Sequence, residues 1–421
     1  MKNILNYQGN KKKLLPFIDN NISTLIPVDK YFLDIFSGGG SVSFFYASKC
    51  KVAFNDLEKY SFHIVNAFLN SSDLTKNDVI SSLKIFKKYY EENLILLKSK
   101  LHDFIEKETE FIESGDITIY ENYSYRYPSI WNHGFSSITN DYLTVEKLND
   151  SKIFMYILFT TYYANTYFGI QQCIEIDSIR YAINKIPLKL QSLFFTALYH
   201  AMNLSVFSKD GHMAQPLSMK KYTKRGISRL KISVINELEK FINDFEIIQS
   251  NYDYKGFNMD FEELIKTDFF KDKIGLVYAD PPYTDMQYSR YYHLLNTVTE
   301  YEFKAPTIKK DLYTKGLYLE NRTQSKLSCK GTCIDSMKKL IDACNKYKKN
   351  LVISFGYPEK NNNEKTDRYV MDINELILLA KKIYGDSNVE VVTEGYLHSN
   401  HRNSFKKRVL EYLIVCRGGE K

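Results

Sequence analysis

The strongest constraint on the fold of this chain is an apolar run that ends in two prolines. Residues 274–280, IGLVYAD, have the composition of a buried strand, and Pro281 and Pro282 follow directly. Proline has no backbone N–H and cannot continue the hydrogen bonds of a sheet, so the strand must stop at Asp280. The sequence therefore predicts a rigid, extended hinge, residues 280–283, at the end of a buried strand.

A second short strand, near the start of the chain, leads into glycines. YFLDIF (31–36) is apolar, SGGGS follows, and SVSFFYASK then has a helical pattern. KVAFND (51–56) predicts the next strand, with Asp56 at its end. A strand, a glycine turn and a helix bring the backbone close to a ligand at the carboxyl end of a parallel sheet. The glycine spacing matches neither G-x-G-x-x-G nor G-x-x-x-x-G-K-[ST], which argues against a dinucleotide pyrophosphate or a nucleoside triphosphate.

The order of strands and helices divides the chain into three blocks. Residues 1–70 and 256–421 alternate strands with helices and predict one discontinuous α/β domain, which closes with an antiparallel hairpin. Residues 71–255 interrupt this alternation with charged helical stretches, a basic segment, and an aromatic loop around Trp131 that we expect to be packed. We expect this block to be an inserted, mainly helical domain.

Composition limits the class of protein without fixing its partner. The net charge of +7 over 421 residues permits a polyanionic partner but does not require one. Six scattered cysteines, a polar and lysine-rich start, and the lack of an apolar run of the ~20 residues that span a bilayer predict a cytoplasmic protein with free thiols and no membrane partner.

The hinge carries the most specific chemical signal. The Asp280 carboxylate and the Pro281 carbonyl are two fixed acceptors, which suit a planar NH2 group with two hydrogens to donate. Tyr283 can offer a flat face to the ring that bears this amine. Asp56 lies 18 positions after Gly38, a spacing typical of an acid that binds ribose hydroxyls, although capping of the following helix is an equal alternative.

These motifs and their order resemble those of the Dam-like (group alpha) DNA adenine methyltransferases. YQGNKKKLL (7–15), DIFSGGGS (34–41) and YADPPY (278–283) carry the resemblance, which covers the two α/β blocks better than the middle block. It implies a Rossmann-like S-adenosylmethionine-dependent methyltransferase fold with an inserted target-recognition domain at 71–255. It places the catalytic residues at Asp280, Pro281 and Tyr283, and the cofactor contacts at Tyr7, Lys11, Asp34, Gly38, Asp56, Asp260, Phe261 and Asp280.

The resemblance also implies an activity. We expect site-specific transfer of a methyl group to the exocyclic amine (N6) of an adenine flipped out of duplex DNA, as the modification part of a restriction–modification system. A cognate restriction endonuclease is then a candidate partner, without a stable complex. Two alternatives remain open: methylation of the exocyclic amine of cytosine, and a non-catalytic nucleic-acid-binding module of the same fold.

Double-stranded DNA needs a cationic surface, and the basic segment of the middle block is the first candidate. A solvated helix face is the alternative for this segment. We expect DNA contacts from its six cations, Lys220, Lys221, Lys224, Arg225, Arg229 and Lys231. The similarly basic loop 398–408 is a second candidate. We expect no metal, because Cys329 and Cys333 with His398 and His401 do not have the spacing of a zinc site.

Overall fold

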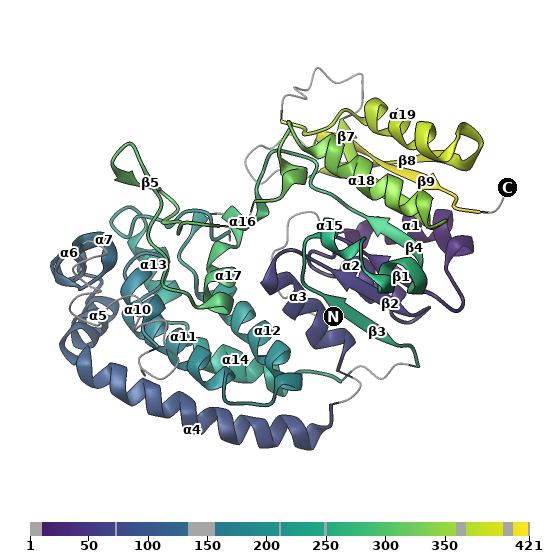
Figure 1. Ribbon diagram of the computed structural model, residues 1–421. Helices are drawn as coiled ribbons and strands as arrows, with labels where there is room; N and C mark the ends of the chain where they lie inside the picture. Colours follow the sequence, from purple (N-terminus) through teal and green to yellow (C-terminus); the bar gives the residue numbers. More distant parts are fainter. Residues whose placement is uncertain are drawn as a thin grey trace. The chain divides into compact units, whose positions relative to one another are not determined.

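The computed structural model describes residues 11–71, 74–133, 156–209, 212–247, 251–322, 324–358, 368–398 and 407–419. The chain forms two compact units (Figure 1). The first, called the sheet unit below, comprises Tyr7–Asn70, Ile248–Gln287 and Thr323–Lys421. The second, the helical unit, comprises Met1–Asn6, Ser71–Ile247 and Tyr288–Arg322. Among the described residues, no helix is long and apolar enough to cross a membrane.

The sheet unit is built on seven strands in the order β3-β2-β1-β4-β7-β9-β8. The first five are parallel, and β9 runs antiparallel to both of its neighbours. The sequence prediction of a mostly parallel sheet that closes with an antiparallel hairpin is thereby confirmed. The strands are β1 (Tyr31–Asp34), β2 (Val52–Asn55), β3 (Tyr254–Phe257), β4 (Ile274–Ala279), β7 (Asn350–Pro358), β8 (Val389–His398) and β9 (Lys407–Cys416).

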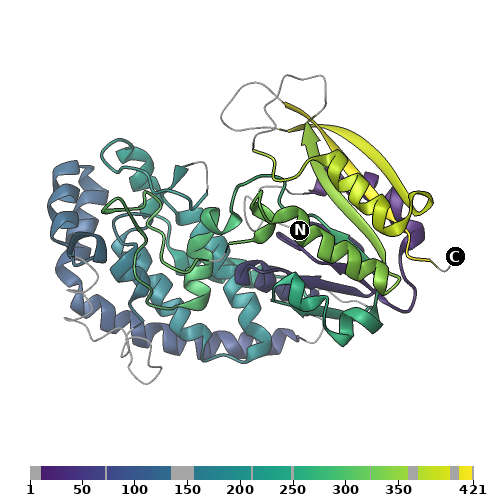
Figure 2. The ribbon, with the colours of Figure 1, turned by 45° about the horizontal axis from the view of Figure 1, so that its top comes forward.

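Helices cover both faces of this sheet, which explains why its central strands are apolar on both sides. On one face, Leu33, Val277 and Ile353 pack with α15 (Phe261–Leu264), α18 (Cys333–Lys346) and α19 (Ile373–Tyr384). On the other, Phe32 and Leu276 pack with α1 (Leu15–Ile22), α2 (Ser41–Tyr46) and α3 (Lys59–Leu69). Both views show α18 and α19 side by side on one face (Figures 1 and 2). Short helical turns complete the unit: η1 (Lys11–Lys13), η2 (Ser23–Leu25), η4 (Phe269–Lys273), η5 (Lys326–Ser328) and η6 (Asp386–Asn388).

The helical unit agrees with the expected mainly helical insertion. Its described helices are α4 (Lys76–Lys100), α5 (His102–Ser114), α6 (Ile117–Arg126), α7 (Ile130–His133), α10 (Leu158–Tyr162), α11 (Ile170–Ile183), α12 (Leu188–Ser205), α13 (Thr223–Leu230), α14 (Val234–Asn243), α16 (Tyr288–Tyr291) and α17 (His293–Glu300). A short hairpin of β5 (Ile308–Lys309) and β6 (Leu312–Tyr313) completes it. Helix α11 lies at its centre and is buried along most of its length.

Segment Tyr288–Arg322 lies in the helical unit, whereas the sequence analysis assigned it to the α/β block 256–421. A buried cation explains this placement. The Arg180 guanidinium of α11 donates hydrogen bonds to the carbonyls of Val298 (2.8 Å) and Thr299 (3.1 Å) at the end of α17. Satisfying a buried guanidinium requires such acceptors, so the segment is held against α11. The functional roles assigned to the two parts of the chain stay predictions.

Candidate active site

The order of the strands places the glycine turn and the hinge at residues 280–283 at one edge of the sheet. Strands β1 and β4 are neighbours, but the chain continues from β1 to β2 on one side, while β7 pairs with β4 on the other. Asp34 pairs in register with Tyr278, so the glycine turn and the hinge both follow the carboxyl ends of adjacent strands. In open α/β sheets, ligands bind outside the carboxyl ends at the point where the strand order reverses.

The glycine turn requires glycine at Gly40. This residue precedes α2 with φ = 76°, in the left-handed region that other residues adopt at a cost. A Cβ there would lie 2.8 Å from both the Phe44 ring and the Val65 side chain. Asp56 closes the turn, because its carboxylate accepts hydrogen bonds from the backbone N–H groups of Gly38 (2.8 Å) and Glu58 (2.9 Å). Asp56 therefore stabilises the turn and also the entry to α3.

Carboxylates concentrate negative charge at this edge, and one of them, Asp34, is buried. Asp34 is 1 % exposed and accepts hydrogen bonds from the N–H (3.1 Å) and hydroxyl (2.6 Å) of Ser43. Burial raises the pKa of Asp34 to about 7; the Ser43 hydroxyl opposes this, and the charges of Asp280 and Asp56 add to it. Burial also raises the pKa of Asp56, against the hydrogen bonds it accepts. A cationic ligand would relieve this cost.

The hinge contains a buried ion cluster. Lys11 Nζ lies 3.2 Å from Asp280 Oδ1 and donates a 2.7 Å hydrogen bond to Glu411 Oε1. It also contacts the Tyr283 hydroxyl, which donates to Asp280 at 2.6 Å. The Tyr283 carbonyl accepts a 3.0 Å hydrogen bond from the Val370 N–H, which fixes the hinge after its last residue. The structure thus brings two predicted residues that are far apart in the sequence, Lys11 and Asp280, into contact.

The cluster sets the charge of the hinge carboxylate. Burial raises the pKa of Asp280 to about 6; the Lys11 ammonium opposes this rise, and the Glu411 charge adds to it. Burial by itself would lower the pKa of Lys11, but the charges and hydrogen bonds of Asp280 and Glu411 together raise it. Burial, followed by the charges of both acids, raises the pKa of Tyr283 well above its ordinary value. Lys11 is therefore the cation that keeps Asp280 ionised near neutral pH.

Glu411 is a member of this cluster that the sequence analysis missed. Its side chain is fully buried on β9 and accepts a hydrogen bond from the Ser354 hydroxyl of the neighbouring strand β7. Its second oxygen, Oε2, has no hydrogen-bond partner among the described residues. A signal was present: Glu411 is the single acid in the strand VLEYLIVC (409–416), which predicts a buried partner.

Asp260 and Phe261 lie at the start of α15. The Asp260 carboxylate accepts a 2.8 Å hydrogen bond from the N–H of Glu262 and so caps this short helix. Phe261 is buried and meets the Phe36 ring edge-on, with 5.4 Å between centroids. The Asn258 side chain donates a 2.7 Å hydrogen bond to the Asp56 carbonyl, which links this segment to the glycine turn.

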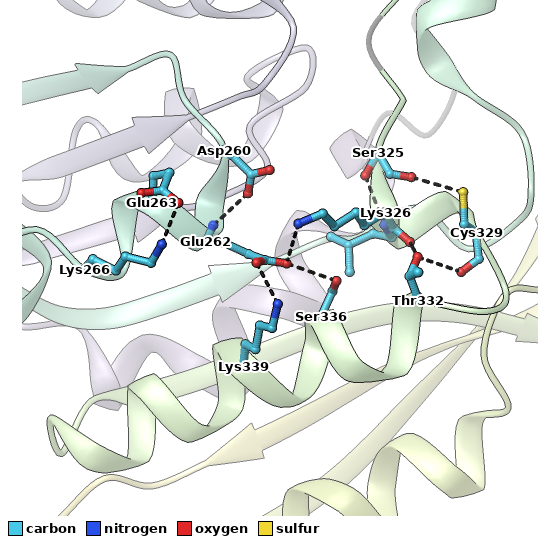
Figure 3. Close-up of polar contacts among 11 residues, drawn as sticks. Asp260, Glu262, Glu263, Lys266, Ser325, Lys326, Cys329, Thr332, Ser336 and Lys339 are labelled. Atoms are coloured by element: carbon cyan, nitrogen blue, oxygen red, sulfur yellow. Dashed lines mark hydrogen bonds and ion pairs between the residues drawn. The ribbon is translucent and has the colours of Figure 1, made fainter.

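A salt-bridge network supports the same segment from α18 (Figure 3). Glu262 accepts a hydrogen bond from Ser336 and pairs with Lys339 at 2.8 Å and Lys326 at 3.3 Å, as Figure 3 shows. Hydrogen bonding from Lys339 lowers the pKa of Glu262. The network fixes α15 to α18 and η5, so Asp260 and Phe261 have a rigid support.

The predicted DNA-contact residues lie in the helical unit, on and around α13. Lys221, Lys224 and Lys231 are exposed, and Lys220 forms an exposed ion pair with Glu121 at 2.8 Å. The two arginines instead bind backbone: Arg225 donates to the Ser208 carbonyl at 3.1 Å, and Arg229 donates to the Leu204 carbonyl. Tyr7 and most of the loop 398–408 lie outside the described residues.

Comparison with known proteins identifies the family. The model of the D12 class N6 adenine-specific DNA methyltransferases matches residues 7–366. The chain belongs to this family. Its sequence is similar to the Type II methyltransferase M.FokI of Planomicrobium okeanokoites (25 % identity over 71 % of this chain and 37 % of the relative) and to the Modification methylase StsI of Streptococcus sanguinis (29 %, over 43 % and 24 %).

A third relative matches almost the whole chain. The Modification methylase LlaI of Lactococcus lactis subsp. lactis is 22 % identical over 98 % of this chain and 54 % of the relative. The chain thus spans between about a quarter and about half of the length of these three relatives.

Family membership implies S-adenosylmethionine as methyl donor, and the edge of the sheet fits this molecule. Its sulfonium and amino groups are cations, which suit the carboxylates at this edge: Asp34 is buried, and Asp56 and Asp280 are partly buried. The Ser37 hydroxyl in the glycine turn is buried and has no hydrogen-bond partner among the described residues, so it is available to a bound ligand. Phe36 and Phe261 add aromatic surface beside the turn.

Proposed function

We propose that this protein is a DNA methyltransferase of the Dam-like (group alpha) type, which methylates the N6 amine of adenine in duplex DNA. One observation carries the proposal: the Asp280–Pro281 acceptors follow β4 beside the glycine turn that follows β1. The proposal is supported because two acceptors able to bind an amine and a turn suited to a cationic donor then lie at one edge of one sheet.

The roles of the hinge residues follow from their chemistry. The Asp280 carboxylate and the Pro281 carbonyl accept the two hydrogens of the amine, which directs the nitrogen lone pair away from the ring. The Tyr283 hydroxyl and the Lys11 ammonium hold the Asp280 carboxylate in place. The Tyr283 ring packs against Phe355 at 5.0 Å and is fixed as a stacking surface for the base. S-adenosylmethionine supplies the methyl group as an activated sulfonium.

Binding of the donor is assigned to the residues of the turn and of α15. Asp34 and Asp56 face the cationic and ribose groups, respectively, and Asp260 with Phe261 supports the adenine moiety. Tyr7, Gly38 and Lys11 complete the proposed set, and Lys11 has the further role of positioning Asp280. The exposed lysines around α13 are the proposed phosphate contacts.

The experiment is transfer of a tritiated methyl group from S-adenosylmethionine to unmethylated DNA. We expect Asp280→Ala to lose transfer by roughly 10²–10³-fold while it retains donor binding, since one fixed acceptor is removed. Asp268→Ala is the matched control: Asp268 lies just before the same strand in an exposed ion pair with Lys271, and we expect normal transfer. Near-normal turnover of the Asp280 variant would refute the catalytic assignment.

The product distinguishes the alternatives. Mass spectrometry of nucleosides from the methylated DNA should find N6-methyladenine. N4-methylcytosine would indicate the cytosine enzyme, and DNA binding without transfer would indicate a non-catalytic module. Two of the three relatives are named modification methylases, so we propose that this chain likewise protects DNA from a cognate endonuclease, without a stable complex with it. Resistance of modified host DNA to that nuclease tests this part.

A further inference from the structure

The buried acid of β9 has no role in the proposed reaction as described so far. Glu411 is 0 % exposed, and its Oε1 accepts hydrogen bonds from Lys11 Nζ at 2.7 Å and from the Tyr283 hydroxyl at 3.1 Å. The Ser354 hydroxyl donates to the same oxygen, whereas Oε2 has no hydrogen-bond partner among the described residues. A carboxylate removed from water is costly unless it is paired, so an acid in this apolar strand needs a reason.

The charges of the buried ion cluster do not balance. Among the described residues, the cluster holds one ammonium, that of Lys11, and two carboxylates, those of Asp280 and Glu411. Burial, followed by the charges of these two acids, raises the pKa of both Tyr278 and Tyr283 well above the ordinary value, so both hydroxyls stay neutral. With both carboxylates ionised, the cluster carries one negative charge in excess, which a single proton would neutralise.

The two carboxylates of the cluster differ in their access to a substrate. Glu411 is enclosed, whereas the Asp280 side chain is 22 % exposed at the carboxyl end of β4. Among the described residues, the contacts of Asp280 with Lys11 and Tyr283 both use Oδ1, which leaves Oδ2 to the amine. The charges of Asp280 and Asp34 also repel each other, which favours a proton on one of them. Asp280 is therefore the acid of the cluster that can take a proton from a substrate.

Methylation of an amine releases a proton that needs an acceptor. When the nitrogen lone pair forms the bond to the methyl group, the nitrogen gains the positive charge that the sulfonium loses. An N–H bond then breaks, its electron pair stays on nitrogen, and the proton forms an O–H bond with Asp280. This step leaves Asp280 neutral, so Lys11 would be a buried cation without a counter-ion if Glu411 were absent.

We propose that Glu411 is a positioning residue, which stays ionised as the permanent counter-ion of Lys11 and thereby allows Asp280 to accept the amine proton as a base. This inference rests on the proposed function. The distances support it, because Lys11 Nζ lies 2.7 Å from Glu411 Oε1 and 3.2 Å from Asp280 Oδ1. The Tyr283 hydroxyl lies 2.6 Å from Asp280 and 3.1 Å from Glu411, so it can turn to Glu411 when Asp280 becomes neutral.

The test measures methyl transfer in a single turnover at pH 9, where Asp280 is ionised, with saturating S-adenosylmethionine and a duplex that the wild-type protein methylates. We expect Glu411→Gln to reduce the rate constant about ten-fold, a part of the roughly 10²–10⁴-fold that a general base contributes, with little change in the affinity for either substrate. The matched control is Glu394→Gln. Glu394 pairs with Glu411 in register on β8 but is exposed, and we expect the wild-type rate constant. A wild-type rate constant in Glu411→Gln would overturn the proposal.

A double-mutant cycle separates a counter-ion from a merely structural residue. If Glu411 acts by neutralising Lys11, its replacement should cost nothing once Lys11 is also replaced. We therefore expect similar rate constants for Lys11→Met and Lys11→Met/Glu411→Gln, in contrast to the loss in the wild-type background. An equal loss in both backgrounds would overturn the proposal. The comparison within the Lys11→Met background also decides the matter if Glu411→Gln alone does not fold.

Carbon-13 NMR of the aspartate carboxyl groups gives a readout that does not depend on catalysis. The resonance missing from Asp280→Asn identifies Asp280, and its titration midpoint, expected at about 6 in the wild type, should fall in Glu411→Gln. If the wild-type protein transfers no methyl group, the proposed function fails, and the two midpoints still decide whether Glu411 controls the protonation of Asp280. If it transfers methyl groups but the midpoint is the same in Glu411→Gln, the proposed function stands and the role of Glu411 fails.

Discussion

Removal of the Lys11 ammonium should move the pH dependence of methyl transfer to higher pH. Asp280 must be ionised to act as an acceptor, and burial holds its pKa at about 6 while Lys11 Nζ lies 3.2 Å away. With an effective dielectric constant of about 20, a pair at this distance gains at most ~5 kcal/mol, which corresponds to ~4 pKa units. The Asp280 side chain is 22 % exposed, so screening by solvent reduces the electrostatic gain of the pair. We therefore expect Lys11→Met to raise the midpoint of the pH dependence of methyl transfer by roughly 1–2 pH units.

Glu411→Gln should shift the same midpoint in the opposite direction. The Glu411 charge raises the pKa of Asp280, and without it Lys11 pairs with Asp280 alone. The assay is kcat for methyl transfer between pH 5 and 9 with both substrates saturating, for the wild type and the two variants. Midpoints that move in the same direction, or that do not move, would refute the account of the cluster.

The pH dependence of stability supplies an independent check, because ionisation of Asp280 favours methyl transfer but disfavours the folded state. The pKa of Asp280 is raised in the folded protein, so its contribution to stability is present below its ordinary pKa of 3.8 and is lost as pH rises through about 6. Acidification from pH 7 to pH 5 should therefore reduce methyl transfer, whereas the protonation of Asp280 over this range should not destabilise the folded protein. Denaturant unfolding at both pH values measures this.

Three further outcomes follow from the described contacts. Gly40→Ala should destabilise the sheet unit by roughly 1–3 kcal/mol in denaturant unfolding, since its Cβ would lie 2.8 Å from neighbouring side chains at a positive φ, whereas Gly331→Ala, with open space around it, should change stability little. Asp34→Asn should abolish the decrease in S-adenosylmethionine affinity that we expect in the wild type as pH falls through about 7, measured by calorimetry; a decrease of equal size in the variant would assign it to another group. Lys221→Gln/Lys224→Gln should weaken DNA binding and reduce its log–log salt slope by about 2, and an unchanged slope would remove α13 from the DNA interface.

The sequence was sufficient where local rules decide the structure. Proline cannot donate to a sheet, so the end of β4 before Asp280 follows from the sequence alone, and β4 does end at Ala279. The glycine turn, the fold class and the closing antiparallel hairpin follow from similarly local patterns, because strand and helix periodicity is set by neighbouring residues.

The site's electrostatics depend on contacts between distant segments. Glu411 and Lys11 are 400 positions apart, and the choice of Lys11 as the partner of Asp280 depends on how β9 pairs with β7. In the sequence, Arg225 and Arg229 have the appearance of DNA contacts like the lysines around them, but in the structure both bind backbone carbonyls. Local pattern fixes which groups a chain carries, whereas burial and pairing, which arise only when the whole chain packs, decide which of those groups remain charged and exposed.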